Sequence, residues 1–142
     1  MNRDKLKDIY NKYNLAKEDI FILKFGSTEK PIITRSGIEK IQNQLKIQIQ
    51  YKLEKVSDDH KSCIILATGV VFGDGIAQQG QPPKPKHMMA SFGECNPRNN
   101  KSDYPISIAE KRAKARVVLQ ISGLYMEGIM SEDESEDFKK HD

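Results

Sequence analysis

Hydrophobic positions recur with two different periods along the chain, and these periods predict helices and strands. From Asp4 to Tyr13 apolar residues repeat at intervals of three and four, which predicts a short amphipathic helix. The apolar segment Glu18–Phe25 is typical of a short strand or an extended docking segment. Thr34 suits the N-cap of a helix over Arg35–Gln44. Gly37 weakens that helix by roughly 1 kcal/mol relative to alanine.

Three strands follow. Apolar and polar residues alternate from Leu45 to Leu53, which predicts one buried face and one wet face. A polar turn leads to Cys63–Phe72, which is apolar on both faces and is therefore expected to be a central strand covered on both sides. Residues 73–86 are rich in Gly, Gln and Pro and form a long predicted loop. His87–Gly93 is the third predicted strand.

The longest predicted helix covers Tyr104–Met126. Pro105 suits its first position, and Gly123 marks a place where it can end. Four cations lie in its first half, where the helix dipole disfavours them: Lys111, Arg112, Lys114 and Arg116. Their crowding indicates an anionic partner. A solvated face, with aliphatic stems lying over apolar surface, explains the same pattern equally well.

These elements predict an α+β domain with a single three-stranded antiparallel β-meander, short N-terminal helices and a long C-terminal helix packed across the sheet. We expect one domain over residues 1–130 and an acidic tail over 131–142. Ser131 and Glu134 match the capping-box pattern and predict a short final helix. The surrounding acidic run is equally typical of disorder.

Charge is unevenly spread along the 142 residues. The chain carries +3, but residues 131–142 hold six acidic residues and two lysines, a balance of −4 that leaves +7 on residues 1–130. A basic domain of this kind is suited to bind a polyanion. No transmembrane run or signal peptide is recognised, so we expect a cytoplasmic protein without membrane contact. Cys63 and Cys95 are expected to be reduced thiols.

Catalytic and metal-binding patterns are weak. His60, Cys63, His87 and Cys95 match no zinc template. A metal-dependent nuclease would need convergent carboxylates. The four candidate carboxylates are Asp74, Glu94, Asp103 and Glu110, and two of these four fall in predicted loops. No GxSxG sequence or phosphate-binding glycine loop occurs, and no cofactor is expected. Scattered cations with few aromatic residues favour a groove that grips a nucleic-acid backbone.

The stretch Cys63–Leu124 resembles the Rad52-like single-strand annealing proteins, a superfamily that includes phage recombination proteins. The resemblance is carried by SFGE (Ser91–Glu94) and by IAEKRAKARVVLQISGL (Ile108–Leu124), and TRSGIEKIQ (Thr34–Gln42) is similar to a preceding helix of small phage members. It implies a ring or filament of subunits that binds single-stranded DNA along a shared basic groove. It also implies pairing of complementary strands without nucleotide hydrolysis.

For such a groove we expect Lys111, Arg112 and Arg116 to grip phosphates. Arg35 and Lys40 would form the opposite wall, and Arg98 would add a loop contact. Replacing Arg112 and Arg116 with alanine is then expected to weaken binding without unfolding the domain. The acidic tail would limit nonspecific binding, dock a partner protein or only aid solubility. Two other functions stay open: a metal-dependent DNA nuclease, and an adaptor domain with an incidental basic patch.

Overall fold

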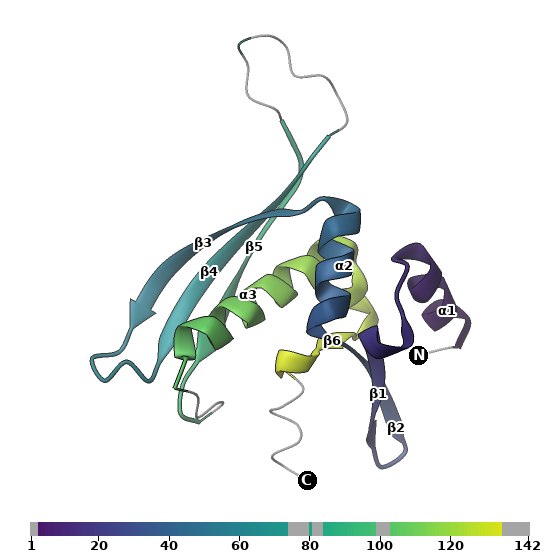
Figure 1. Ribbon diagram of the computed structural model, residues 1–142, viewed down its shortest axis with the longest axis horizontal. Helices are drawn as coiled ribbons and strands as arrows, with labels where there is room; N and C mark the ends of the chain where they lie inside the picture. Colours follow the sequence, from purple (N-terminus) through teal and green to yellow (C-terminus); the bar gives the residue numbers. More distant parts are fainter. Residues whose placement is uncertain (1–2, 74–79, 81–83, 99–102, 135–142) are drawn as a thin grey trace.

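The helices and strands place the chain in the predicted α+β class (Figure 1). The computed structural model describes residues 3–73, 80, 84–98 and 103–134. In these residues the helices are α1 (Arg3–Lys12), α2 (Arg35–Leu45) and α3 (Pro105–Ser122). The strands are β1 (Ile20–Phe25), β2 (Thr28–Ile33), β3 (Gln48–Val56), β4 (Cys63–Phe72), β5 (Pro85–Cys95) and β6 (Met130–Ser131). Two 3₁₀ turns cover Lys17–Asp19 and Leu124–Glu127.

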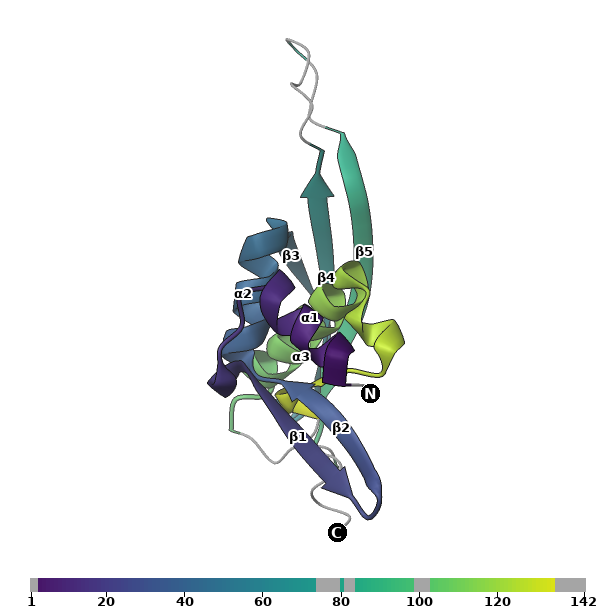
Figure 2. The same ribbon diagram turned by 90° about the vertical axis from the view of Figure 1, so that its right-hand side faces the viewer.

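The strands form two sheets, whereas the sequence predicted one. The larger sheet has the antiparallel order β3-β4-β5, and the smaller has the order β1-β2-β6. In the smaller sheet β2 pairs antiparallel with β1 and parallel with β6, so segments about one hundred residues apart lie side by side. The β1–β2 hairpin and the long strands β4 and β5 extend toward opposite ends of the molecule (Figures 1 and 2).

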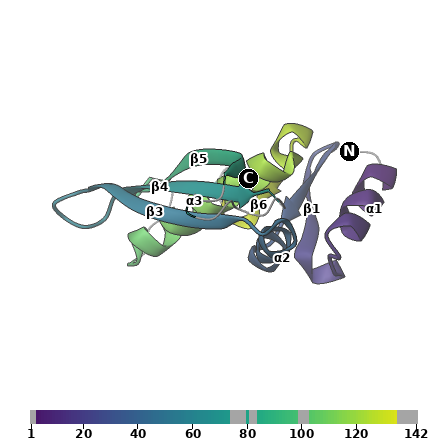
Figure 3. The ribbon, with the colours of Figure 1, turned by 90° about the horizontal axis from the view of Figure 1, so that it is seen from above.

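Helix α3 joins the two halves of the fold. Pro105 opens it and Gly123 closes it in the left-handed conformation (φ 81°), as predicted. One side packs on β4 and β5 through Ala109, Ala113 and Val117. Val118 and Leu119 on another side join the core formed with α1, α2 and the smaller sheet. Seen from above, α2 lies between the larger sheet and α1 (Figure 3).

Coverage of the larger sheet differs from the prediction. Helix α3 lies over β4 and β5 but not over β3, so the apolar face of β3 is largely open: Tyr51 is 41% exposed and Leu53 is 50% exposed. Strand β4 is central as predicted, but only its face toward α3 is fully buried. Lys52 lies opposite Leu66 on the other face. In the described part of the chain this face is largely open, because Ile64 on β4 is 36% exposed and Phe92 on β5 is 52% exposed.

Residues 131–134, the first four of the predicted acidic tail, are packed against the rest of the fold. Ser131 pairs with Ile33 and is 1% exposed, and Asp133 is 4% exposed. Residues 132–134 are helical, as the capping-box pattern suggested, and residues 135–142 lie outside the described part of the chain. Among the described residues, no helix is long and apolar enough to cross a membrane.

The closest approach of α3 to the sheet depends on Gly93. A Cβ atom built there would lie 2.1 Å from the Ala109 oxygen and 2.4 Å from the Ala113 nitrogen, both backbone atoms that cannot rotate away. We therefore expect Gly93→Ala to lower the free energy of unfolding by about 3 kcal/mol in urea titration. Gly73→Ala is the control, because its nearest neighbour, Lys86 Cβ, is 4.0 Å away. Equal midpoints for the two variants would contradict the close packing.

Candidate nucleic-acid interface

The N-terminus of α2 is fixed by side-chain caps. Thr34 is the N-cap, as predicted, and its Oγ1 accepts a hydrogen bond from the Gly37 amide. Gly37 is required there, because a Cβ atom would lie 2.7 Å from the Asp19 carbonyl oxygen. The glycine that weakens the predicted helix therefore lets α2 pack against the start of β1.

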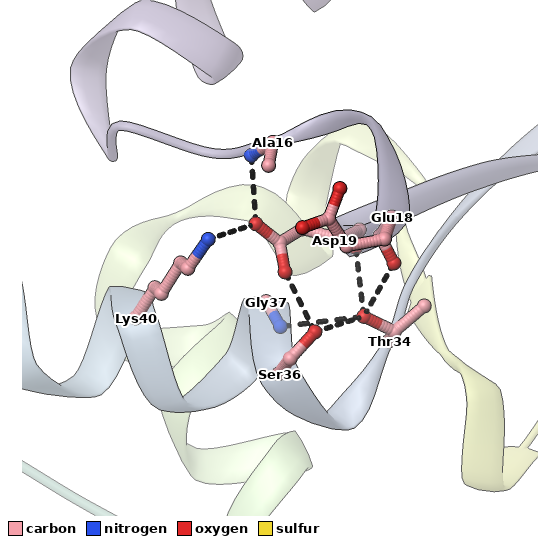
Figure 4. A network of polar contacts seen from close by, with 7 residues as sticks. All are labelled: Ala16, Glu18, Asp19, Thr34, Ser36, Gly37 and Lys40. Carbon is pink, nitrogen blue, oxygen red and sulfur yellow. Dashed lines mark hydrogen bonds and ion pairs between the residues drawn. The ribbon is translucent and has the colours of Figure 1, made fainter.

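Lys40 belongs to a polar network around the buried carboxylate of Asp19 (Figure 4). Asp19 Oδ2 accepts hydrogen bonds from Lys40 Nζ at 2.6 Å and from the Ala16 amide at 2.7 Å, and Oδ1 accepts one from Ser36 Oγ at 2.6 Å. Burial disfavours the charged form, but these hydrogen bonds outweigh it and hold the pKa of Asp19 below its ordinary value. Lys40 therefore stabilises the junction between α2 and β1.

Arg112 is buried, with 1% of its surface exposed. Its Nη1 donates to the carbonyl oxygen of Glu94 at 3.0 Å. Glu94 lies on β5, an edge strand of the larger sheet. The guanidinium thus satisfies a backbone acceptor of that edge, and its burial removes it from the surface on which it was predicted to contact a phosphate.

Arg116 lies one turn further along α3 and also binds the edge strand β5. Its Nη1 donates to the Phe92 carbonyl oxygen at 2.7 Å, and both terminal nitrogens bind the Glu94 carboxylate at 2.9 and 3.0 Å. Its Nε binds Glu134 at 2.5 Å. Burial alone would lower the pKa of Arg116, but the two carboxylates outweigh it and raise the pKa. The hydrogen bond from Arg116 lowers the pKa of Glu94, so the pair is charged on both sides.

The cations of α3 therefore point in two directions. Arg112 and Arg116 face β5, whereas Lys111 and Lys114 face α2. Between α2 and α3 lies a hollow of about 230 Å³, and three cations and three carboxylates line it: Arg35, Lys111, Lys114, Glu39, Glu110 and Asp133. Lys114 Nζ is 3.7 Å from Glu39, and Lys111 has no ion pair among the described residues.

The structure brings together two of the six predicted site residues, Arg35 and Lys111. Lys40 follows Arg35 by five positions on α2, which turns it about 140° around the helix, and it lines a different hollow beside Tyr13. Arg98 is exposed in the segment between β5 and α3, and its backbone amide binds Asn96 Oδ1. Lys114 was noted among the cations but left out of the predicted set.

The position of Arg112 around the helix could have predicted that this arginine is buried. Arg112 follows Ala109 by three positions and precedes Ala113, so it lies within about 60° of Ala109 on the side of the helix that carries these alanines. Treating every cation as solvated hid this position. The Glu94 and Phe92 carbonyl oxygens need donors because β5 is an edge strand of the larger sheet. The sequence alone does not reveal the order of the strands.

The other candidate chemistries gain no geometric support. Among the described residues no three His, Cys, Asp or Glu side chains are grouped closely enough to hold a metal ion, and Asp74 lies outside those residues. Cys63 and Cys95 are buried cross-strand neighbours that form no disulfide with each other. Burial, with a smaller contribution from Cys95, raises the pKa of the Cys63 thiol.

The comparisons with protein families and with curated proteins identify no relative of this chain. No protein-family model matches this chain, and the comparison with curated proteins finds no match. The resemblance to annealing proteins therefore stays a prediction.

Arg112 and Arg116 are now expected to matter for folding, which reverses the expectation from sequence. Replacing both with alanine removes a buried side chain and leaves two carbonyl oxygens and Glu94 without these donors. We expect a loss of about 3 kcal/mol or more in the free energy of unfolding, measured in urea. The matched control is Lys111→Ala with Lys114→Ala on the opposite side of α3, expected to cost less than about 1 kcal/mol. A wild-type midpoint for the arginine variant would show that these contacts contribute nothing.

Proposed function

We propose that this protein binds single-stranded DNA and promotes annealing of complementary strands in recombination or repair, without nucleotide hydrolysis. The observation that carries the proposal is the hollow between α2 and α3. Cations 76 or more positions apart in the sequence, Arg35 on one helix and Lys111 and Lys114 on the other, line it together. The resemblance of Thr34–Gln42 and Ile108–Leu124 to annealing proteins falls on the same two helices.

The side chains that line the hollow are suited to bind the phosphates of a nucleic-acid backbone. Lysine and arginine neutralise phosphates without reading base edges, and this supplies most of the sequence-independent affinity for nucleic acid. None of the described residues that line it is aromatic. A strand held by its phosphates keeps its bases available, so pairing with a complementary strand can read the sequence. Annealing by this route requires no bond-breaking step by the protein.

Lys111→Ala with Lys114→Ala tests this site directly. Removing two phosphate contacts should weaken binding of labelled oligo-dT roughly tenfold in dilute salt and reduce the log–log salt slope by about 1.4. Fluorescence anisotropy across a salt series gives both quantities. Lys24→Ala with Lys61→Ala removes the same charge from exposed positions away from the hollow and should change neither strongly.

The same preparations distinguish the alternatives. Wild-type protein should accelerate pairing of complementary oligonucleotides without ATP. Mg²⁺-dependent shortening of the oligonucleotide would support a nuclease instead. Failure of the wild-type protein to bind oligo-dT in dilute buffer would refute the proposal and leave the adaptor hypothesis.

We also propose that the protein assembles with further copies of itself through the edge of β3, which pairs only with β4 among the described residues. The two edges of the larger sheet differ: Arg112 and Arg116 occupy carbonyl oxygens of β5, whereas β3 exposes a strand edge beside Tyr51, Leu53 and Val56. An exposed apolar edge strand is a template for pairing with another strand. Such pairing would extend the sheet from one subunit to the next.

Leu53→Lys should disrupt this assembly, because it places a charge in the middle of the exposed edge strand. Light scattering across a concentration series should show an oligomer for the wild type and a smaller species for the variant. Ile22→Lys is the control, because Ile22 is an exposed apolar residue (40%) on β1 of the other sheet. An unchanged mass for Leu53→Lys, or a wild-type monomer at all concentrations, would contradict assembly through β3.

A further inference from the structure

Three consecutive carboxylates after β6 contact arginines of α2 and α3 and the N-terminus of α2. Glu132 Oε1 accepts a hydrogen bond from the Arg35 backbone amide at 2.6 Å. Asp133 Oδ1 accepts from Arg35 Nε at 3.0 Å and from Nη2 at 2.6 Å. Glu134 Oε1 accepts from Arg116 Nε at 2.5 Å. The segment thus places three anions on donors contributed by α2 and α3.

These carboxylates bind as phosphate oxygens would. The guanidinium fork of arginine binds carboxylate and phosphate with similar geometry. Arg35 is the first residue of α2, so its amide has no acceptor within the helix and donates to Glu132 at the helix N-terminus, where anions are stabilised. Asp133 lines the same hollow as Lys111 and Lys114. The proposed phosphate site and the carboxylates therefore overlap.

The acidic segment can leave without dismantling the core. Ile129 is 1% exposed, and Met130–Ser131 pair with β2, so the chain is anchored just before the carboxylates. Glu94 holds Arg116 with two hydrogen bonds whether or not Glu134 is present. Release of Glu132, Asp133 and Glu134 breaks their polar contacts and exposes the buried carboxylate of Asp133 to water, but it removes no apolar side chain from the core.

We propose that Glu132, Asp133 and Glu134 form a built-in competitor of the nucleic-acid backbone. Glu132 and Asp133 occupy Arg35 at the α2–α3 site, and Glu134 holds the segment on Arg116 of α3, until a strand displaces it. This inference rests on the proposed function and names the regulation of the same site. A single phosphate would replace one carboxylate and gain little. A strand offers several adjacent phosphates, so it can displace the whole segment and also reach Lys111. The competitor thereby selects polymers over mononucleotides.

The test compares two variants with the same change of three charges. Glu132→Gln, Asp133→Asn and Glu134→Gln together weaken the competitor. Glu29→Gln, Asp58→Asn and Glu127→Gln together change exposed carboxylates elsewhere. Anisotropy with labelled oligo-dT should show the first variant binding roughly tenfold more tightly than the second. Equal affinities would mean that only net charge matters, and weaker binding by the first would make the segment a structural clamp; either result overturns the inference.

A measurement on the wild-type chain avoids any effect of substitution on folding. During titration with oligo-dT, the backbone amide signals of Glu132, Asp133 and Glu134 should move in NMR spectra toward the positions of an unfolded chain. Signals that stay in place while oligo-dT binds would overturn the competitor and leave the proposed function intact. Absence of oligo-dT binding by wild type and both variants would refute the proposed function itself, and the competitor with it.

Discussion

The arrangement of this protein depends on how α3 is rotated between the larger sheet and α2. Gly93 lets the helix backbone touch β5, and Arg112 and Arg116 tie the same side of the helix to the Glu94 and Phe92 carbonyl oxygens. With that side fixed, Lys111 and Lys114 must face α2. The rotation therefore divides one run of cations into a structural pair and a pair available to a ligand.

The structural pair also affects the edges of the sheet. An arginine that binds a backbone carbonyl oxygen of an edge strand blocks one position where another strand could pair. Strand β5 is protected in this way at two carbonyl oxygens, and β3 is not covered by α3. The same interaction that orients α3 thus makes the two edges unequal, which favours growth of an assembly from β3.

Local sequence signals predicted much of the fold because they act over a few residues. Thr34, Pro105 and Gly123 marked helix ends correctly, and alternation or apolar runs located strands of the larger sheet. Strand β2 was not predicted, because it contains Pro31, which has no backbone N–H to donate and is uncommon inside strands. Strand β6 is two residues long and pairs with residues almost one hundred positions earlier, so no local pattern could reveal it.

The site was harder to predict because a charge in the sequence does not state its partner. Arg35 and Lys111 were placed in one hollow as expected, but Lys40 is bound to a buried carboxylate that the pattern gave no reason to suspect. The acidic residues 132–134 looked like part of a separate tail, yet they lie on Arg35 and Arg116. Helix rotation and long-range ion pairs decided these outcomes.

Lysine footprinting tests the central claim that the hollow between α2 and α3 holds the strand. Acetylation of the protein with and without oligo-dT, read by mass spectrometry, reports which ammonium groups the strand covers. We expect Lys111 and Lys114 to lose reactivity in the complex, while Lys46 at the C-terminus of α2 and Lys52 on β3 keep theirs. Protection of Lys46 and Lys52, with Lys111 and Lys114 still reactive, would contradict it.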